Sequence, residues 1–404
     1  MRVTSNLIYS QSALSMQKAN ERYLEVQEKI AEQSDIIRPS DDPNGAAQLL
    51  RYDADTQLLE QYDQNMTLAS NSLEYESVAL ESLTSTLDEI NVLLISSANG
   101  AYSQDDLDTT AGEMEALLAS VADLMNSKNS NGQYIFAGTN SSSPAFVLNS
   151  DGEYEYAGNE AQQMSQIGST VTIATNDSGT IFQNTWTRNT FTASTSAGTA
   201  TLNYTVSDQD AYDAFIEDTY SAVDGTQNQF TLTTTAGSPD QFSLTDSSGT
   251  VLATGDYESG AAISYNGMEF TLTGAAGSTV DITLDQPERD NVLNQVMEAI
   301  TALTDPNLSD EEKEYYRLNA MTSIENTQTS ISTASSSVGA RINSIDNQTE
   351  LSSAKQIYNA QAQENIGGLD IYKATTELEL TETALSATQL LFNRLSSLSL
   401  FDSL

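Results

Sequence analysis

The sequence of 404 residues contains no cysteine and no histidine. Without cysteine there are no disulfides and no thiolate nucleophiles, and without histidine there is no imidazole acid–base chemistry. Ordinary zinc sites are built from these two residue types and are excluded with them. These absences remove thiolate, imidazole and ordinary zinc chemistry only. We expect no cofactor, no metal ion and no enzymatic activity, and the alternatives that use carboxylates are weighed below.

Long apolar runs are also missing. No stretch of 18 or more apolar residues occurs, so we expect no membrane-spanning helix. The first thirty residues lack the apolar segment of a cleaved secretory signal. If the protein works outside the cell, we expect it to be exported by another route.

Basic residues are scarce in the middle of the chain. The net charge is −42, and residues 52–288 hold only Lys128 and Arg188 against 34 acidic residues. A field of this sign repels nucleic acids and anionic membrane surfaces. Residues 1–51 are nearly neutral, so crowded copies would repel one another least at this end. A saline habitat would explain the acidity equally well.

What the chain does have is a seven-residue repeat of apolar side chains at its two ends. The N-terminal version is looser, because Leu7 and Leu14 are followed by the amphipathic stretch of Tyr23, Val26 and Ile30. Such a repeat keeps one apolar stripe facing a partner helix, as in coiled coils. We expect the two terminal helices to pair with each other and then with the same helices of neighbouring copies. The candidate assembly seam is Leu7, Leu14, Ile371, Leu378, Leu385 and Phe392. Such positions can also be plain packing residues.

A second repeat predicts a long helix over residues 44–98. Its seam residues are spaced by seven without a miss: Leu59, Met66, Leu73, Leu80, Leu87 and Leu94. A companion row of Tyr62, Ala69, Leu83 and Ile90 runs beside this seam, and Glu76 is the one polar residue in that row. The pattern suits either an ordinary bundle core or a longer helical rod.

Between the helical parts the composition changes. Residues 145–285 are rich in Thr, Ser, Gly and Asn, and their apolar residues alternate with period two. Short strands at this spacing indicate an all-β domain, and Asn266-Gly267 predicts a tight hairpin turn. A helix near residues 211–222 divides this region and allows two lobes. A further hairpin arm is expected around residues 133–137.

Two breaks interrupt the helices. In the segment Arg38-Pro39-Ser40-Asp41-Asp42-Pro43, the first proline stops one helix, and the capping residues and second proline start the next. Gly367-Gly368 forms the second break. Arg38, Asp41 and Asp42 can be simple capping residues or contacts between copies.

The expected fold class is therefore α+β, a helical rod built from both ends of the chain with an inserted all-β domain. We expect three domains. Residues 1–40 and 368–404 would form a terminal coiled-coil domain, residues 41–144 and 286–367 a helical rod domain with a short hairpin arm, and residues 145–285 the β domain.

This arrangement resembles the flagellin-like proteins of the bacterial flagellum, and within them the hook-associated proteins of the hook–filament junction. The likeness covers roughly residues 1–147 and 286–404. Gln33-Ser34-Asp35 departs from the family, which usually has a glycine and a basic residue there. The segments that carry the resemblance are Met1-Arg2-Val3-Thr4, Tyr9, Arg38 to Pro43, Gln133 to Thr139, Ile263 to Leu272 and Leu398 to Leu404.

The resemblance implies a structural adaptor that joins the hook, through another junction protein, to the flagellin filament. It implies export through the flagellar type III apparatus without cleavage, and assembly of copies into a closed ring outside the cell. The implied partners are further copies, the neighbouring hook-associated protein, flagellin, and an export chaperone that binds the C-terminal helix. No nucleic acid or membrane partner is expected.

Two other functions stay open. The chain could be a flagellin subunit of the filament itself, in which case it would be far more abundant than a junction protein. The β domain could instead bind glycans or hydrolyse them, because carboxylate pairs such as Asp208 and Asp210 can serve glycoside hydrolysis. The cluster Asp105, Asp106 and Asp108 could hold Ca²⁺, or simply favour the start of a helix.

Overall fold

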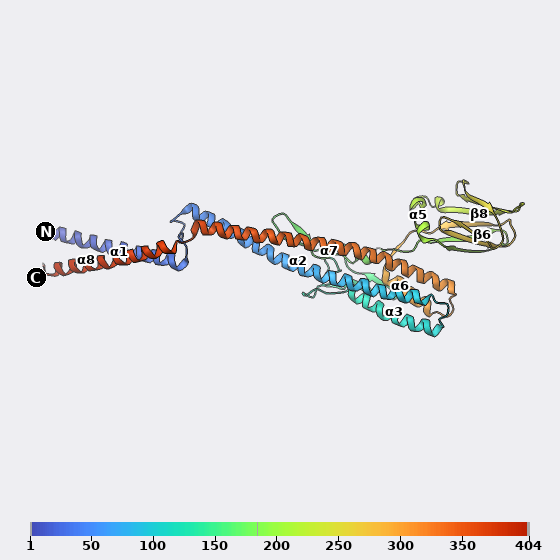
Figure 1. Ribbon diagram of the computed structural model, residues 1–404, viewed down its shortest axis with the longest axis horizontal. Coiled ribbons are helices and arrows are strands. Elements are labelled where there is room, and N and C mark those ends of the chain that lie inside the picture. Colours follow the sequence, from blue (N-terminus) through green and yellow to red (C-terminus); the bar gives the residue numbers. More distant parts are fainter. Residues whose placement is uncertain (1, 184, 402–404) are drawn as a thin grey trace. The chain divides into compact units, whose positions relative to one another are not determined.

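The computed structural model describes residues 2–183 and 185–401 of the chain, and side chains for residues 7–183 and 185–394 (Figure 1). Met1 and residues 402–404, which belong to the segments that carry the resemblance, lie outside this description. The chain forms two compact units: residues 1–70, 164–173 and 341–404 make up the first, and residues 71–163 and 174–340 the second. Helices α2 (Pro43–Ser97) and α7 (Asp310–Gly367) contribute to both.

The first unit contains α1 (Arg2–Glu32) and α8 (Ile371–Phe401) together with the adjoining parts of α2 and α7. Strand β3 (Met164–Gln166) and the start of β4 (Thr172–Ala174) also belong to it. Side-chain contacts tie α2 to α7 here: Gln356 donates a hydrogen bond to Asp63 (2.6 Å), and Asn359 donates one to Asp55 (2.8 Å).

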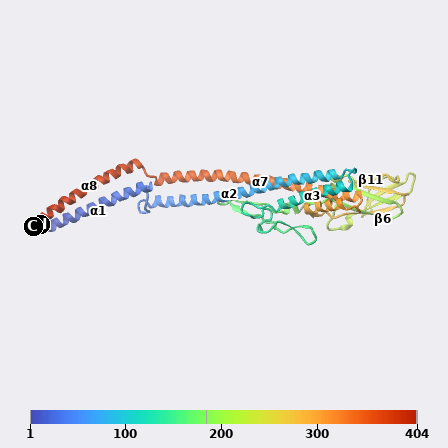
Figure 2. The same ribbon diagram turned by 90° about the horizontal axis from the view of Figure 1, so that it is seen from below.

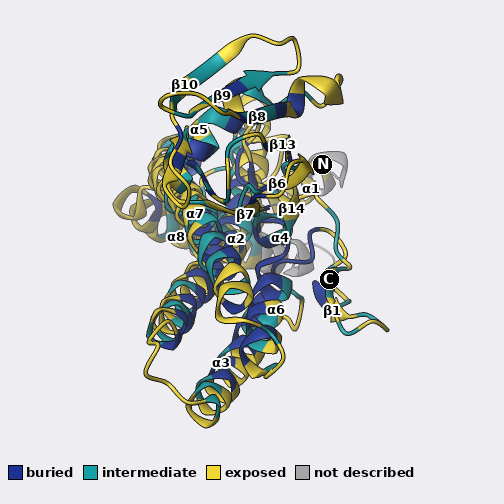
Figure 3. Cartoon of the chain, turned by 90° about the vertical axis from the view of Figure 1, so that its right-hand side faces the viewer, coloured by how far each residue is buried: buried dark blue, intermediate teal, exposed yellow. Residues whose placement is uncertain are grey.

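The helical part of the second unit adds α3 (Gln104–Met125) and α6 (Val292–Thr304) to α2 and α7. Helix α3 begins at a capping box in which Ser103 and Asp106 bond each other's backbone N–H groups. Helices α3 and α6 pack against each other, and Figure 3 shows buried residues on both. Met114, Val121, Val296 and Ala299 are fully buried there, as their helical spacing requires.

Two antiparallel sheets build the β domain. In the described chain one sheet has the order β10-β9-β8-β13-β6 and the other β11-β12-β7. The strands are β6 (Phe191–Ala197), β7 (Thr201–Val206), β8 (Gln229–Thr235), β9 (Gln241–Asp246), β10 (Val251–Asp256), β11 (Ala262–Tyr265), β12 (Met268–Thr273) and β13 (Thr279–Leu284). Asn266 and Gly267 close the predicted hairpin with φ values of 44° and 82°, which confirms the turn.

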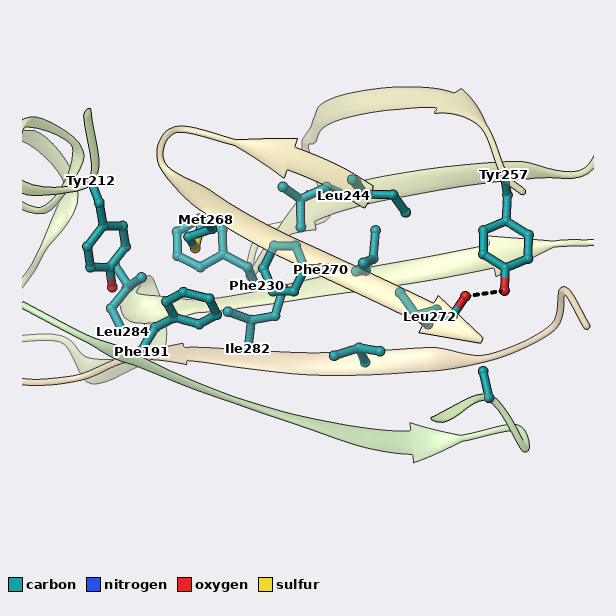
Figure 4. Packing of buried hydrophobic residues seen from close by; sticks show 14 of the residues in the cluster. Phe191, Tyr212, Phe230, Leu244, Tyr257, Met268, Phe270, Leu272, Ile282 and Leu284 are labelled. Atoms are coloured by element: carbon teal, nitrogen blue, oxygen red, sulfur yellow. Dashed lines mark hydrogen bonds between the residues drawn. The ribbon is translucent and has the colours of Figure 1, made fainter. Parts of the chain in front are cut away.

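One hydrophobic core joins the two sheets. Phe270 and Met268 of β12 face Phe230 of β8 and Ile282 of β13 (Figure 4). Helix α5 (Gln209–Thr219) buries Tyr212 in the same core. The predicted helix therefore covers a single core and does not separate two lobes.

Short elements complete the second unit. They are β1 (Phe146–Leu148), β2 (Tyr154–Tyr156), β5 (Thr185–Trp186), β14 (Arg289–Asp290), α4 (Thr180–Gln183) and the 3₁₀ helix η1 (Gly225–Asn228). The guanidinium of Arg289 lies 4.1 Å from the Trp186 ring at the paired β5 and β14. The chain enters and leaves the β domain through this pair.

The expected arm at residues 133–137 differs from the prediction. Tyr134 and Ala137 form only isolated bridges, to Lys128 and Ser178. The backbone of this segment bonds several different segments, including Ser127 through Ile135 N and Gly179 through Phe136 O. No single partner strand runs beside it, so Ile135 and Phe136 are buried without a regular hairpin.

Among the described residues, none of the helices combines the length and the apolar character needed to cross a membrane. The α+β fold class predicted from the sequence is confirmed, with long helices from both parts of the chain and a strand-rich insertion between them.

Candidate assembly site

Helices α1 and α8 lie side by side and run in opposite directions (Figures 1 and 2). The rings of Tyr9 and Phe392 lie 5.1 Å apart near one end of the pair. At the other end the backbone of Ser34 bridges Gly368. These two contacts fix the register of the helices. A residue that follows Tyr9 by a given number of positions therefore lies at the same height along the pair as the residue that precedes Phe392 by that number.

The packed row of α8 follows the predicted seven-residue repeat. Its members are Ala374, Leu378, Thr381, Leu385, Thr388 and Phe392, which are more buried than the residues around them. The corresponding row of α1 is Ser12, Met16, Ala19, Tyr23, Val26 and Ile30. Alternating steps of three and four keep each row on one helix face, so the pair has coiled-coil packing.

The predicted seam residues do not all lie in these rows. Leu378, Leu385 and Phe392 do, while Ile371 at the start of α8 is 54% exposed. Leu7 and Leu14 are 67% and 51% exposed. Leu14 lies two residues before Met16 of the row, about 200° around the helix, and thus faces away from α8. Leu7 likewise lies two residues before Tyr9, outside the packed contact.

The sequence contained a signal for the correct row. Tyr9, Met16, Tyr23 and Ile30 are also spaced by seven. The prediction included Tyr23 and Ile30 in an amphipathic stretch, whereas it placed Leu7 and Leu14 where Tyr9 and Met16 belong. The aromatic contact of Tyr9 with Phe392 shows why a tyrosine suits this row.

An open groove runs along one side of the α1/α8 pair. Its lining combines exposed apolar side chains with small polar ones: Leu7, Ile8, Gln11, Ser12, Ser15, Thr388 and Leu391. Leu391 is 58% exposed and Ile8 49% exposed. Packing α1 against α8 thus leaves apolar surface on both helices that no other part of the described chain covers.

The two helix breaks are bonded to each other. Helix α1 ends at Glu32 because Gln33 adopts a left-handed φ of 52°. The N–H of Asp35 then donates to the carbonyl of Gly367 (2.8 Å), and the Ser34 hydroxyl donates to the same oxygen (3.3 Å). The residues that depart from the family pattern, Gln33 to Asp35, are therefore the ones that join the breaks.

The proline-containing motif forms the turn that follows. The N–H of Arg38 donates to the Asp41 carboxylate (2.9 Å), and the N–H of Asn44 donates to the Asp42 carboxylate (3.1 Å). The guanidinium of Arg38 forms an ion pair with Glu28 (2.9 Å). Asp41 and Asp42 thus act as caps, and their charged side chains stay exposed.

A profile described as the bacterial flagellin N-terminal helical region matches residues 3–141. Flagellar hook-associated protein 3 of Salmonella typhimurium is 25% identical over 189 residues, which are 47% of this chain and 59% of that protein. The protein of the same name from Escherichia coli is 25% identical over 34% of this chain and 44% of its own length. The chain thus matches about half the length of these relatives.

Solved structures agree on the fold. Xanthomonas campestris FlgL has a TM-score of 0.58 at 22% identity, over 78% of this chain and 99% of its own. The flagellar junction protein FlgL of Legionella pneumophila has a TM-score of 0.56 at 22% identity, over 80% and 100%. The chain thus has the fold of these FlgL structures, and its N-terminal third matches the flagellin N-terminal helical region.

The second repeat, from Leu59 to Leu94, is buried among the helices of both units. Leu59 and Met66 are 5% and 2% exposed in the first unit, where the Thr349 hydroxyl lies 3.4 Å from the Met66 sulfur. Leu73, Leu80, Leu87 and Leu94 are fully buried in the second. These side chains pack inside one copy, which leaves the α1/α8 pair as the more open surface.

Glu76, the one polar residue in the row beside this repeat, has a structural role that the sequence did not suggest. Glu76 is fully buried, and its carboxylate accepts a hydrogen bond from the N–H of Asp177 (2.9 Å). The neighbouring Asn176 donates from its amide to the carbonyls of Ile135 (2.9 Å) and Gly138 (3.1 Å). One buried carboxylate thus holds the segment before α4 in place.

The carboxylates considered for catalysis or metal binding are mostly helix caps. Asp208 accepts a hydrogen bond from Ala211 at the start of α5, and Asp106 caps α3. Among the described residues there is no group of three or more acidic side chains arranged to hold a metal ion.

The Asp41 cap makes the turn sensitive to acid. The hydrogen bond from the Arg38 backbone lowers the pKa of Asp41 below its ordinary value of 3.8. A lowered pKa means that the cap stabilises the turn fully above the unfolded value and is lost as pH falls through the folded value. We expect the Arg38 amide to exchange faster in Asp41→Asn than in the native protein at pH 7, and alike in both at pH 2. Hydrogen exchange followed by NMR measures this.

Gly368, which directly follows α7, and Gly339 within α7 provide a matched test of the joint. A Cβ at Gly368 would lie 2.4 Å from the Glu364 carbonyl oxygen, so Gly368→Ala should destabilise the first unit by about 1–3 kcal/mol. A Cβ at Gly339, inside the helix, meets nothing within 4 Å, so Gly339→Ala should stabilise by about 0.5–1 kcal/mol. Thermal unfolding measures both, and equal effects would contradict the role of Gly368.

Proposed function

We propose that this chain is a structural subunit of the junction between the flagellar hook and the filament. Copies would form a closed ring, with another hook-associated protein on one side and flagellin on the other. The subunit would catalyse no reaction. The observation that carries this proposal is the apolar surface that remains exposed on both helices after α1 and α8 have packed.

That surface is larger than a single copy needs. The large apolar side chains at least 40% exposed on the two helices are Leu7, Ile8, Tyr9, Leu14, Leu24, Ile371, Tyr372, Leu380, Leu390 and Leu391. Burying one leucine contributes about 1.5–3 kcal/mol, so covering several of them would drive association strongly. Apolar surface grouped in this way is typical of interaction sites.

The charge distribution supports the same arrangement. Residues 52–288 carry 34 acidic residues and two basic ones, whereas residues 1–51 are nearly neutral. Copies that meet through their terminal helices would therefore place little like charge at the contact, while the acidic insertions repel one another and favour solubility.

The remaining parts of the proposal rest on the resemblance to the flagellin-like proteins. The subunit would be exported through the flagellar type III apparatus without cleavage and would act outside the cell, in the flagellum. An export chaperone would cover the C-terminal helix before assembly. The terminal coiled-coil domain (1–40, 368–404), the rod domain (41–144, 286–367) and the β domain (145–285) would be the assembling, supporting and outward parts.

Deletion of the gene tests this function. The deletion strain should build hooks but release flagellin into the medium, because the first filament subunits have nothing to bind. Supplying the chain in trans should restore filaments and swimming. If the deletion strain instead makes and secretes no filament protein at all, the chain is the filament subunit and the junction role is wrong.

A further inference from the structure

The two sides of the α1/α8 pair carry opposite charge. On the groove side, Ile8, Gln11 and Ser15 line the groove, and the same three–four spacing continues to Lys18 and Arg22. Each of these residues directly precedes a residue of the packed row. Lys18 and Arg22 are exposed, and neither forms an ion pair among the described residues.

The groove side as a whole is positive. On α8 it holds Lys373 and Glu377, which also directly precede packed residues, and on α1 it holds Glu25 and Lys29 besides Lys18 and Arg22. The Lys29 ammonium forms an ion pair with the Asp35 carboxylate at a distance of 2.9 Å. Excess positive charge thus remains at Lys18 and Arg22.

The opposite side holds only negative charge. Glu379 and Glu382 directly follow the packed residues Leu378 and Thr381, so they point away from the groove. The matching positions of α1 are uncharged: Ser10, Ala13, Gln17, Asn20, Leu24, Gln27 and Ala31. Both glutamates are exposed, and neither is in an ion pair within the described part of the chain.

The opposite charges lie at the same levels along the pair. Arg22 follows Tyr9 by as many residues as Glu379 precedes Phe392, and Lys18 and Glu382 match to within one residue. Exposed leucines sit among them on opposite sides, Leu24 (52%) beside the glutamates and Leu380 (66%) on the groove side. A neighbour placed beside the pair would bring Leu24 against Leu380.

We propose that copies of this chain bind side by side and head to tail, with the Lys18/Arg22 side of one α1/α8 pair against the Glu379/Glu382 side of the next. This inference rests on the proposed function and specifies its contact surface. Two different surfaces that complement each other generate a ring when the rotation between copies closes, whereas a surface that binds itself stops at a dimer. Complementary charge also suppresses wrong registers.

Charge exchange tests the proposal in the deletion strain. Lys18→Glu/Arg22→Glu makes both sides negative, and Glu379→Lys/Glu382→Lys makes both sides positive. Each variant alone should lower swimming by about tenfold or more, because like charges then meet at every contact. Expressed together, or combined in one chain, the substitutions should restore swimming. The control Arg51→Glu/Lys355→Glu changes net charge equally on α2 and α7, and should swim normally.

A second test does not depend on these charges. The chain has no cysteine, and Ser15 and Ser386 are exposed, at the same level and on opposite sides of the pair. Ser15→Cys/Ser386→Cys should give a ladder of disulfide-linked copies in isolated flagella, while neither single variant gives any link between copies.

The outcomes separate this inference from the proposed function. If the deletion strain does not release flagellin, the junction function itself fails. If it does, but the charge variants swim normally, or their mixture does not restore swimming, or no ladder forms, the side-by-side contact is wrong and the junction function stands.

Discussion

Leu385→Asp should abolish assembly and swimming while leaving the second unit folded. Leu385 lies in the packed row of α8, seven residues before Phe392, and Met16 lies seven residues after Tyr9 at the same level. The substitution removes about 1.5–3 kcal/mol of apolar burial and places a charge in the contact between the helices. Swimming of the complemented deletion strain measures the effect.

The matched control is Thr383→Asp. Thr383 is exposed and lies two residues beyond the packed row, so the same charge there stays in water. Threonine and aspartate have similar helix propensities, so α8 itself should be retained. Normal swimming of Leu385→Asp, or equal loss with Thr383→Asp, would contradict the role of the row.

Phe270→Ala should unfold the β domain at a much lower temperature. Phe270 is fully buried between the sheets, and its ring lies 5.4 Å from that of Phe191. Removal of a buried phenylalanine side chain costs about 3–5 kcal/mol. Calorimetry and near-ultraviolet circular dichroism of the full chain follow this transition, which should shift while the helical signal of the first unit is kept.

The control for Phe270→Ala is a substitution at the neighbouring residue of the same strand. Glu269 points to the other face of β12, so Glu269→Ala should leave the transition within about 0.5 kcal/mol of the native value. Because the α1/α8 pair belongs to the other unit, Phe270→Ala should not alter association through that pair. Loss of the helical signal together with the β domain would show that the two units unfold as one.

The long helices and several strands could be predicted because their patterns are local. The spacing by seven from Leu59 to Leu94 predicted the helix Pro43–Ser97, and Asn266-Gly267 predicted the hairpin of β11 and β12. The strands β6 and β10 were missed. Strand β6 lies at the sheet edge and exposes most of its small polar residues, so it lacks the apolar alternation that marks a strand.

The row that packs within the α1/α8 pair was predicted on α8 and only in part on α1. On α8 the row Leu378, Leu385 and Phe392 is the most apolar seven-residue pattern, and it is the row that packs. On α1 the prediction joined Leu7 and Leu14 to Tyr23, Val26 and Ile30, and only the last three lie in the packed row. The antiparallel register set by Tyr9 and Phe392 decides which residues pack, because only one face of α1 can meet α8.

The sequence by itself determined the α+β class, the long helices, the two breaks, the acidic middle and the resemblance to flagellin-like proteins. These depend on periodicity, capping residues and composition, which need no knowledge of distant neighbours. Only the tertiary structure decided that Leu7 and Leu14 face outward, that Glu76 holds Asp177, and that opposite charges lie on the two sides of the α1/α8 pair. Each of these depends on which residues, far apart in the chain, the fold brings next to one another.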